Sequence, residues 1–428
     1  MTDIQDRQPG ERPLPPPPPG ATPVEPAAPA SPRQGTGGTV LRLGALLALI
    51  VLLGVAVSWW AVVIVLALLV MIFLHELGHF VAARRAGMKV TEFFLGFGPR
   101  IWSIRRGEVE YGIKAVPLGA YVKIIGMSNL EEVDPADEDR TYRSKPYWSR
   151  FCVAVAGSAM HFAIALVLIF ATLALYGQTK PDFWVVNTLT PQSPATQVGL
   201  LRGDRIVAVD GQEVTDFSSL TTYVRGNPGE AVTLTIERDG KTIELTPTLA
   251  ERNPDGEPVG FLGIGPINPY VKESLPEAAG DTFVWFGEIG VQSTKGLFQL
   301  FSPDGISKFA ENFTDSQGPS SNVNTSRPIS PVGLVQVGDF VARNGMADLF
   351  LFLAAINIFI GIFNLTPLPP FDGGHIAVAT YEAIRSRKGK RYYADVSKLL
   401  PVAYIVLTVV LVLFVGGLYL DLTEPIVP

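Results

Sequence analysis

Long apolar runs dominate the hydrophobic pattern of this chain. The first extends from residue 43 to residue 83, about 40 residues, whereas one membrane span needs roughly 20. Trp59 and Trp60 interrupt it near the middle, and tryptophan is typical of the membrane–water interface. The pattern predicts two spans, over 40–58 and 60–83. One long tilted helix is the alternative.

Three later runs each have the length of a single span, and they cover residues 151–176, 349–365 and 402–420. Lysine and arginine are concentrated between the runs, with twelve of them in the loop 84–150 and more in the loop 385–398. Positive charge marks the cytoplasmic loops of membrane proteins. The chain is therefore predicted to be a polytopic α-helical membrane protein of four to five spans, with both basic loops in the cytoplasm.

Polar and apolar residues alternate on both sides of Gly107 in the first basic loop. Alternation around a glycine-containing turn predicts a β-hairpin, here over residues 100–115, and we expect it to be associated with the membrane. The edge of such a hairpin could pair with an unfolded substrate. A ribbon that packs on lipid headgroups is an equally good interpretation.

Residues 183–267 have the shorter, mixed pattern of a soluble α+β domain inserted between the spans. A strand is predicted near 184–186, a helix over 216–224 and a hairpin that turns at Asp239-Gly240. After this domain, residues 268–345 combine an amphipathic stretch with a polar loop at 314–330, and we expect them on the outer face.

The predicted organisation is completed by a tail at 1–38 and two transmembrane regions at 39–182 and 346–428. The tail is rich in proline, alanine and glycine and includes five consecutive prolines, a composition that cannot form a packed core.

Composition supports the membrane interpretation and narrows the candidate chemistry. Hydrophobic residues make up 47% of the chain and charged residues 17%, and the net charge of −6 does not favour nucleic acid as a partner. A single cysteine, Cys152, excludes an intrachain disulfide and a CxxC zinc site. Because the chain has only four histidines, a metal ion must be held by histidine together with carboxylate.

His75, Glu76 and His79 form an HExxH pattern near the end of the first apolar run. On a helix the two histidines lie one turn apart on the same face, so both imidazoles can reach one ion. In zinc proteases with this pattern the glutamate is the general base. Hydrogen-bonded core histidines are the alternative, but ionisable groups inside a membrane span are costly and usually functional.

A second polar group lies in the apolar run that begins at 349. Three prolines and two glycines surround Asp372, and irregular backbone at membrane depth is tolerated only where it lines a cavity or is buried in protein. Asp372 would complete a set of two histidines and one carboxylate. Asn364 could hold an extended substrate backbone, and we place Pro367 and Pro369 at the same substrate-binding segment. A broken helix of the transporter type is the alternative.

His161 lies in the third predicted span. It is either an additional metal ligand or a hydrogen-bonded intramembrane histidine, and the second interpretation is favoured.

The inserted domain resembles a PDZ domain, a family that binds peptide ends by strand addition. The resemblance rests on Ser193-Pro194-Ala195, Gly199-Leu200, Gly203-Asp204 and Val209-Asp210-Gly211. It implies a loop that holds the carboxylate of a peptide terminus. The candidates for that loop are Phe261, Leu262, Gly263 and Ile264.

The two membrane motifs with a PDZ-like insert between them resemble the site-2 protease family of intramembrane zinc metalloproteases. The resemblance covers residues 60–428 and is closest to bacterial members with one PDZ domain. It implies one Zn²⁺ bound by His75, His79 and Asp372, with Glu76 as the catalytic glutamate and Asn364 as a substrate clamp. It also implies that the hairpin is the family's membrane-reentrant element. Many members have asparagine where this chain has His161, and nothing carries over to residues 1–58.

The resemblance implies an endopeptidase of the plasma membrane that cleaves membrane-anchored, single-span proteins such as anti-sigma factors. The active site is expected near the cytoplasmic side, with the PDZ-like domain extracytoplasmic and able to bind peptide termini. Two other functions stay open at this point. One is a catalytically silent PDZ membrane scaffold, and the other is a metal transporter with ligands spread along a path.

Overall fold

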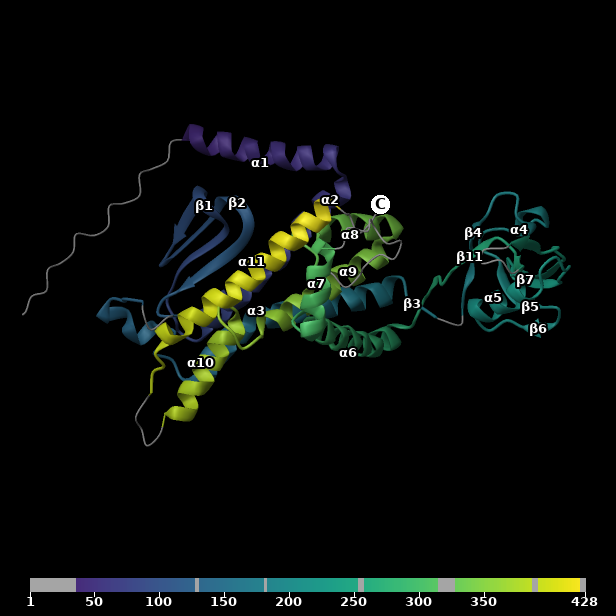
Figure 1. Cartoon of the computed structure of the whole chain (residues 1–428). Coiled ribbons are helices and arrows are strands. Elements are labelled where there is room, and N and C mark those ends of the chain that lie inside the picture. Colours follow the sequence, from purple (N-terminus) through teal and green to yellow (C-terminus); the bar gives the residue numbers. More distant parts are fainter. Residues whose placement is uncertain are drawn as a thin grey trace, which may run out of the picture.

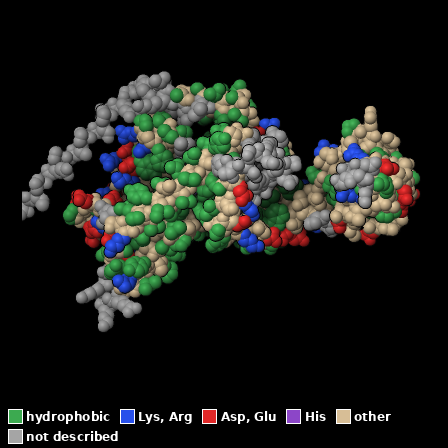
Figure 2. All heavy atoms as spheres, in the orientation of Figure 1, with side chains coloured by type: hydrophobic (Ala, Val, Ile, Leu, Met, Phe, Trp, Pro, Cys, Tyr) green, Lys and Arg blue, Asp and Glu red, His purple; other side chains and the backbone are tan. Residues whose placement is uncertain are grey.

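The computed structural model describes residues 36–127, 131–180, 183–252, 258–314, 328–386 and 392–423. The predicted tail lies outside these residues except for its last three, which begin the first helix. A bundle of helices carries a β-sheet beside one end, and a small α+β domain stands apart beyond the other end (Figure 1). Apolar side chains cover much of the bundle surface in Figure 2, while charged ones gather around the sheet and on the small domain.

The first apolar run divides into two helices, α1 (Thr36–Ala56) and α2 (Trp59–Arg85). Ser58 ends the interruption, because its hydroxyl accepts a hydrogen bond from the Ala61 amide as the N-cap of α2. The predicted break is therefore confirmed as a break between helices. Whether α1 itself crosses the membrane stays a prediction.

Four helical segments of the described chain are long and apolar enough to cross a membrane. They are α2, α3 (Tyr147–Leu175), α9 (Met346–Asn364) and the segment Val396–Thr423, which contains the short helix η2 (Val396–Leu399) and α11 (Leu400–Thr423). Their positions agree with the predicted runs. If the protein has four spans, each of them corresponds to one of these helical segments.

Helix α3 is the centre of the bundle, and α2, α9, α6 (Leu275–Leu300) and α10 (Asp372–Arg385) all pack against it. The α3–α9 contact is made by small and branched apolar side chains such as Ala165, Ile169 and Ala354, all fully buried. Because α2 and α10 both pack on α3, this helix sets their relative positions.

The region expected to be amphipathic helix and loop on the outer face is more helical than predicted. It contains α6, α7 (Pro303–Thr314) and α8 (Pro331–Asn344). Helix α6 packs against α3 and α9, and α8 packs against α2, α9 and α11. Most of the predicted polar loop, residues 315–327, lies outside the described residues.

The hairpin in the first basic loop is confirmed, but its predicted extent was too short. Its strands are β1 (Val90–Arg106) and β2 (Val109–Ile124), and they turn at Gly107. The register places Phe93 opposite both Tyr111 and Val122. The two long strands therefore fold back on each other. A short 3-10 helix, η1 (Pro135–Arg140), then leads to α3.

The inserted domain has the mixed structure that its sequence pattern predicts. A four-stranded sheet has the order β6-β5-β7-β8, and two further pairs are β4 with β11 and β9 with β10. The helix α5 (Phe217–Gly226) and the β7–β8 turn at Asp239 and Gly240, both with positive φ, match the predicted helix and hairpin. The remaining elements are α4 (Pro194–Gln197), β4 (Val185–Leu189), β5 (Arg205–Val209), β6 (Gln212–Glu213), β7 (Leu234–Arg238), β8 (Lys241–Leu245), β9 (Ala250–Arg252), β10 (Val259–Phe261) and β11 (Ile264–Ile267).

A narrow ribbon of two short strands, β3 (Gln178–Thr179) and β12 (Tyr270–Val271), joins this domain to the bundle. The chain enters and leaves the domain side by side, as an inserted domain requires.

Candidate metal centre

The two histidines of the HExxH pattern lie on one face of α2, and both are buried. This face is pressed against α3 at Gly157. A Cβ at residue 157 would lie 2.4 Å from His75 Cε1 and 2.4 Å from His79 Nε2. Gly78 is equally close to the backbone of α3, because a Cβ there would lie 2.5 Å from the Ala156 carbonyl oxygen. The two glycines thus allow α2 and α3 to approach closely around the imidazoles.

The orientation of the His79 ring is fixed by the backbone of α3. His79 Nδ1 lies 2.7 Å from the carbonyl oxygen of Val153. A carbonyl oxygen can only accept, so Nδ1 carries the proton, and the neutral ring presents a lone pair at Nε2. A metal-binding histidine is usually oriented in this way, by a hydrogen bond from the ring nitrogen that does not bind the metal.

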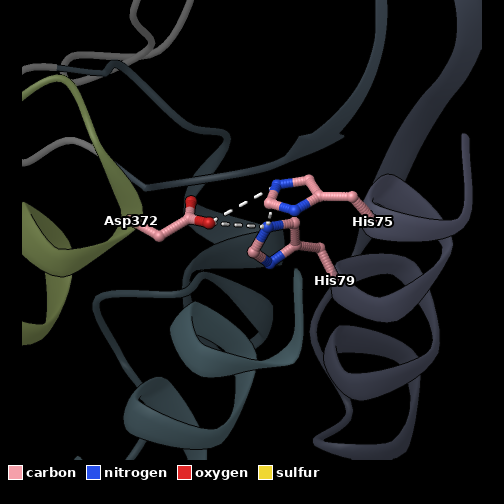
Figure 3. A group of neighbouring side chains, drawn as sticks. All are labelled: His75, His79 and Asp372. Carbon is pink, nitrogen blue, oxygen red and sulfur yellow. Dashed lines mark hydrogen bonds and ion pairs between the residues drawn. The ribbon is translucent and has the colours of Figure 1, made fainter. Parts of the chain in front are cut away.

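Asp372 brings the second motif to the two histidines. The helix α9 ends at Asn364, an irregular proline-rich segment follows, and Asp372 is the first residue of α10. Its Oδ2 lies 3.4 Å from His75 Nε2 and 3.2 Å from His79 Nε2 (Figure 3). The three ligand atoms lie within 4.8 Å of one another, although the residues come from helices almost 300 positions apart in the chain.

This donor set fits a zinc ion. The two Nε2 atoms lie only 3.1 Å apart, and the carboxylate oxygen faces both, so three electron-pair donors point at one spot. A cation relieves the repulsion among them. Two imidazoles and one carboxylate form a known catalytic zinc set, which leaves the fourth position open.

Glu76 lies beside this group without belonging to it. Its Oε2 accepts a hydrogen bond of 3.0 Å from the Val122 amide of β2. The β-sheet therefore holds the Glu76 carboxylate in place. The alternating sequence pattern of the hairpin did not predict this contact.

His161 makes the contact that the hydrogen-bonded interpretation requires. Its Nδ1 lies 2.8 Å from Asn357 Oδ1 on α9, and the Asn357 amide group donates to the Leu353 carbonyl. The ring centroid of His161 is 5.0 Å from that of His75, and His161 is not one of the three clustered groups in the described structure. The sequence did not lead us to predict a role for Asn357. An asparagine inside an apolar span is nevertheless a signal that the sequence shows.

The predicted substrate-binding residues lie on the segment between α9 and α10. Asn364 is half-buried at the last position of α9, Pro367 is exposed, and Pro369 is half-buried. Pro369 also lines a cavity of about 250 Å³ next to the first turn of α10. They therefore lie in the segment that ends at Asp372.

The candidate peptide loop lies in the small domain, beyond the far end of α3 from the sheet (Figure 1). Phe261 ends β10 and Ile264 begins β11. Between them Leu262 is buried in the domain core, and Gly263 has a φ of 90° with Ser193 against it. These residues form a tight turn between two strands and do not contribute to the metal centre.

The chain is similar to known zinc metalloproteases. A model of peptidase family M50 matches residues 63–408. The zinc metalloprotease Rip1 of Mycobacterium bovis is 37% identical over 403 residues, covering 86% of this chain and 96% of the relative. Rip1 of Mycolicibacterium smegmatis is 36% identical, covering 85% and 97%. A putative zinc metalloprotease of Rhizobium meliloti is 29% identical, covering 75% and 86%.

A crystal structure of the PDZ domain of an SdrC-like protein from Listeria monocytogenes is similar to part of the chain. It matches at 22% identity with a TM-score of 0.19, covering 21% of this chain and 93% of that one. Together with the clustered His-His-Asp group, the family match and the relatives identify the chain as a member of peptidase family M50, the site-2 proteases, and as a zinc metalloprotease.

Proposed function

We propose that this protein cleaves peptide bonds within or beside the spans of membrane-anchored, single-span proteins, including substrates of the anti-sigma-factor type. One observation carries the proposal. The two histidines of the His-His-Asp group are buried on α2, an apolar helix long enough to cross a membrane. A substrate must therefore bring its peptide bond to membrane depth to reach the site.

In this proposal His75, His79 and Asp372 bind zinc and Glu76 carries the proton. Zinc, when bound, supplies a Lewis acid that acidifies water and polarises a carbonyl oxygen. Glu76 takes a proton from the attacking water and delivers it to the nitrogen of the leaving amine. The Val122 amide supports this role, because it holds the carboxylate beside the histidines instead of among them.

The substrate is proposed to bind in an extended form. A helical peptide has its carbonyl oxygens hydrogen-bonded, so the scissile segment must unwind before water can attack. The β1–β2 sheet reaches Glu76 and offers a neighbouring edge for strand pairing. Asn364, the last residue of α9, would clamp the same stretch together with Pro367 and Pro369 of the irregular segment that follows.

We propose that the protein lies in the plasma membrane with the metal centre near the cytoplasmic side and the small domain outside. Two features support this orientation. The sheet lies within the basic loop 84–150, and α3, with 29 residues, is about 43 Å long, enough to separate the sheet from the domain by a bilayer. The turn at 261–264 would bind the terminus of a peptide on the outer side.

The test is Glu76→Gln in the full-length protein. Measure zinc content and cleavage of a single-span model substrate on the same purified sample. Glu76→Gln should retain one zinc per chain and lose cleavage, because the amide cannot accept the proton. Glu288→Gln, an exposed site on α6, is the matched control and should cleave as wild type does. Retained turnover in Glu76→Gln, or loss of its zinc, would refute the assignment. A wild type that binds zinc and cleaves nothing would favour the scaffold.

A further inference from the structure

Asp372 depends on α3 for its position relative to the two histidines. His75 and His79 belong to α2, whereas Asp372 begins α10, and α10 packs chiefly against α3. The irregular segment before Asp372 packs closely on the first turn of α10, where a Cβ at residue 373 would lie 2.2 Å from the Thr366 carbonyl oxygen. The placement of the carboxylate depends on this segment at one end of α10 and on the packing of α10 against α3 along the rest of the helix.

A buried ion pair joins these two helices. Arg150, in the first turn of α3, donates from Nη1 to Glu382 Oε2, in the last turn of α10. The two side chains are only 6% and 3% exposed. The other carboxylate oxygen of Glu382 accepts a hydrogen bond of 2.7 Å from the Ala394 amide. Glu382 is thus held from two sides.

One cavity adjoins both the start of α10 and the ion pair. The cavity of about 250 Å³ is bordered by Phe371 and Gly374, the near neighbours of Asp372, and also by Arg150 and Glu382. A further polar contact between the described parts of the two helices joins Tyr147 Oη and Thr380 Oγ1 at 3.3 Å.

We propose that the Arg150–Glu382 pair positions Asp372 in the zinc site by fixing α10 against α3. Both are positioning residues, since neither is among the groups that face the metal. Arg150 lies one turn before Val153, whose carbonyl orients His79. The same end of α3 would therefore position His79 on α2 and, through Glu382, Asp372 on α10. This inference rests on the proposed function, in which Asp372 is the third zinc ligand.

Zinc affinity of the purified full-length protein tests the proposal. The main variant is Glu382→Gln, which keeps the size of the side chain and an oxygen for the Ala394 amide but removes the charge. Measure the zinc Kd by competition with a chelator, the Tm of the zinc-free protein, and kcat and KM at excess zinc. We expect zinc affinity to fall about 10- to 100-fold, as for other residues that orient metal ligands. Excess zinc should largely restore kcat, with KM unchanged.

The matched control is Arg238→Met, which breaks the ion pair with the buried Asp204 in the small domain. It should lower stability without changing the zinc Kd. Arg150→Lys keeps the charge and serves as the second variant if Glu382→Gln fails to fold, and its zinc affinity should fall by a smaller factor. A folded Glu382→Gln or Arg150→Lys whose zinc Kd equals that of wild type or of Arg238→Met would overturn the proposal.

Asp372→Ala separates this proposal from the proposed function. If Asp372→Ala binds zinc as tightly as wild type, the ligand set itself is wrong. If Asp372→Ala loses zinc while Glu382→Gln keeps it, only the positioning role is refuted.

Discussion

Gly157→Ala adds a single methyl group at the most crowded point of the zinc site. A Cβ there would lie 2.4 Å from His75 Cε1 and 2.4 Å from His79 Nε2. Carbon atoms in contact normally lie about 3.5–4.0 Å apart, so each ring would have to move by roughly 1 Å. Zinc–ligand distances tolerate about 0.2 Å, one fifth of that movement. We expect the zinc affinity to fall at least ~100-fold, which corresponds to about 2.7 kcal/mol of binding free energy.

The assay is the zinc Kd from chelator competition, with the Tm of the zinc-free protein measured in parallel. Gly287→Ala in α6 is the matched control, because a Cβ at residue 287 meets no other atom within 4 Å. Alanine is the better helix former by about 1 kcal/mol, so Gly287→Ala should be at least as stable as wild type and bind zinc equally well. A folded Gly157→Ala protein with wild-type zinc affinity would show that the imidazoles are not confined by α3.

Three further predictions concern the ligand set, the orientation and the small domain. Asp372→Ala should weaken zinc binding severely in a direct stoichiometry measurement, and tight one-to-one zinc in this variant would give the third position to another residue, with His161 the first to test. Reporter fusions after Gly38 and near Glu138 should be cytoplasmic and a fusion near Arg238 external; an external Gly38 fusion would leave four spans. If the small domain excludes substrates with bulky outer domains, replacing residues 183–267 with a flexible linker should improve cleavage of full-length substrate and leave pre-trimmed substrate unaffected. A folded, zinc-loaded deletion that still rejects full-length substrate would contradict this gating role.

The parts of the site that the sequence predicts are those in which spacing implies geometry. His75 and His79 are four residues apart, and on any helix this spacing brings two side chains to one face. Asp372 could be added because the helix-breaking residues around it mark irregular backbone at membrane depth. The spatial group of these three residues confirms that the two motifs meet.

The parts that could not be predicted depend on main-chain atoms or on partners far apart in the chain. Every residue has a carbonyl and nearly every one an amide, so nothing in the sequence singles out Val153 for His79. Arg150 is one of twelve basic residues in its loop, and its partner Glu382 follows 232 positions later. The full length of β1 and β2 could not be predicted either. Phe93 lies opposite both Tyr111 and Val122, and the alternation around Gly107 predicts a single pairing of two short strands.

The hydrogen bond from Val122 to Glu76 is made by the main chain, and this has a consequence for genetics. Replacing Val122 with alanine, or with any residue other than proline, keeps the main-chain donor. The effects of such substitutions would therefore reflect only the packing of the side chain. Only proline lacks the amide hydrogen. Variation at residue 122 among homologues would therefore say little about whether the contact exists. A position central to the chemistry can in this way look unimportant in every alignment, and Val122→Pro is the one substitution that would reveal it.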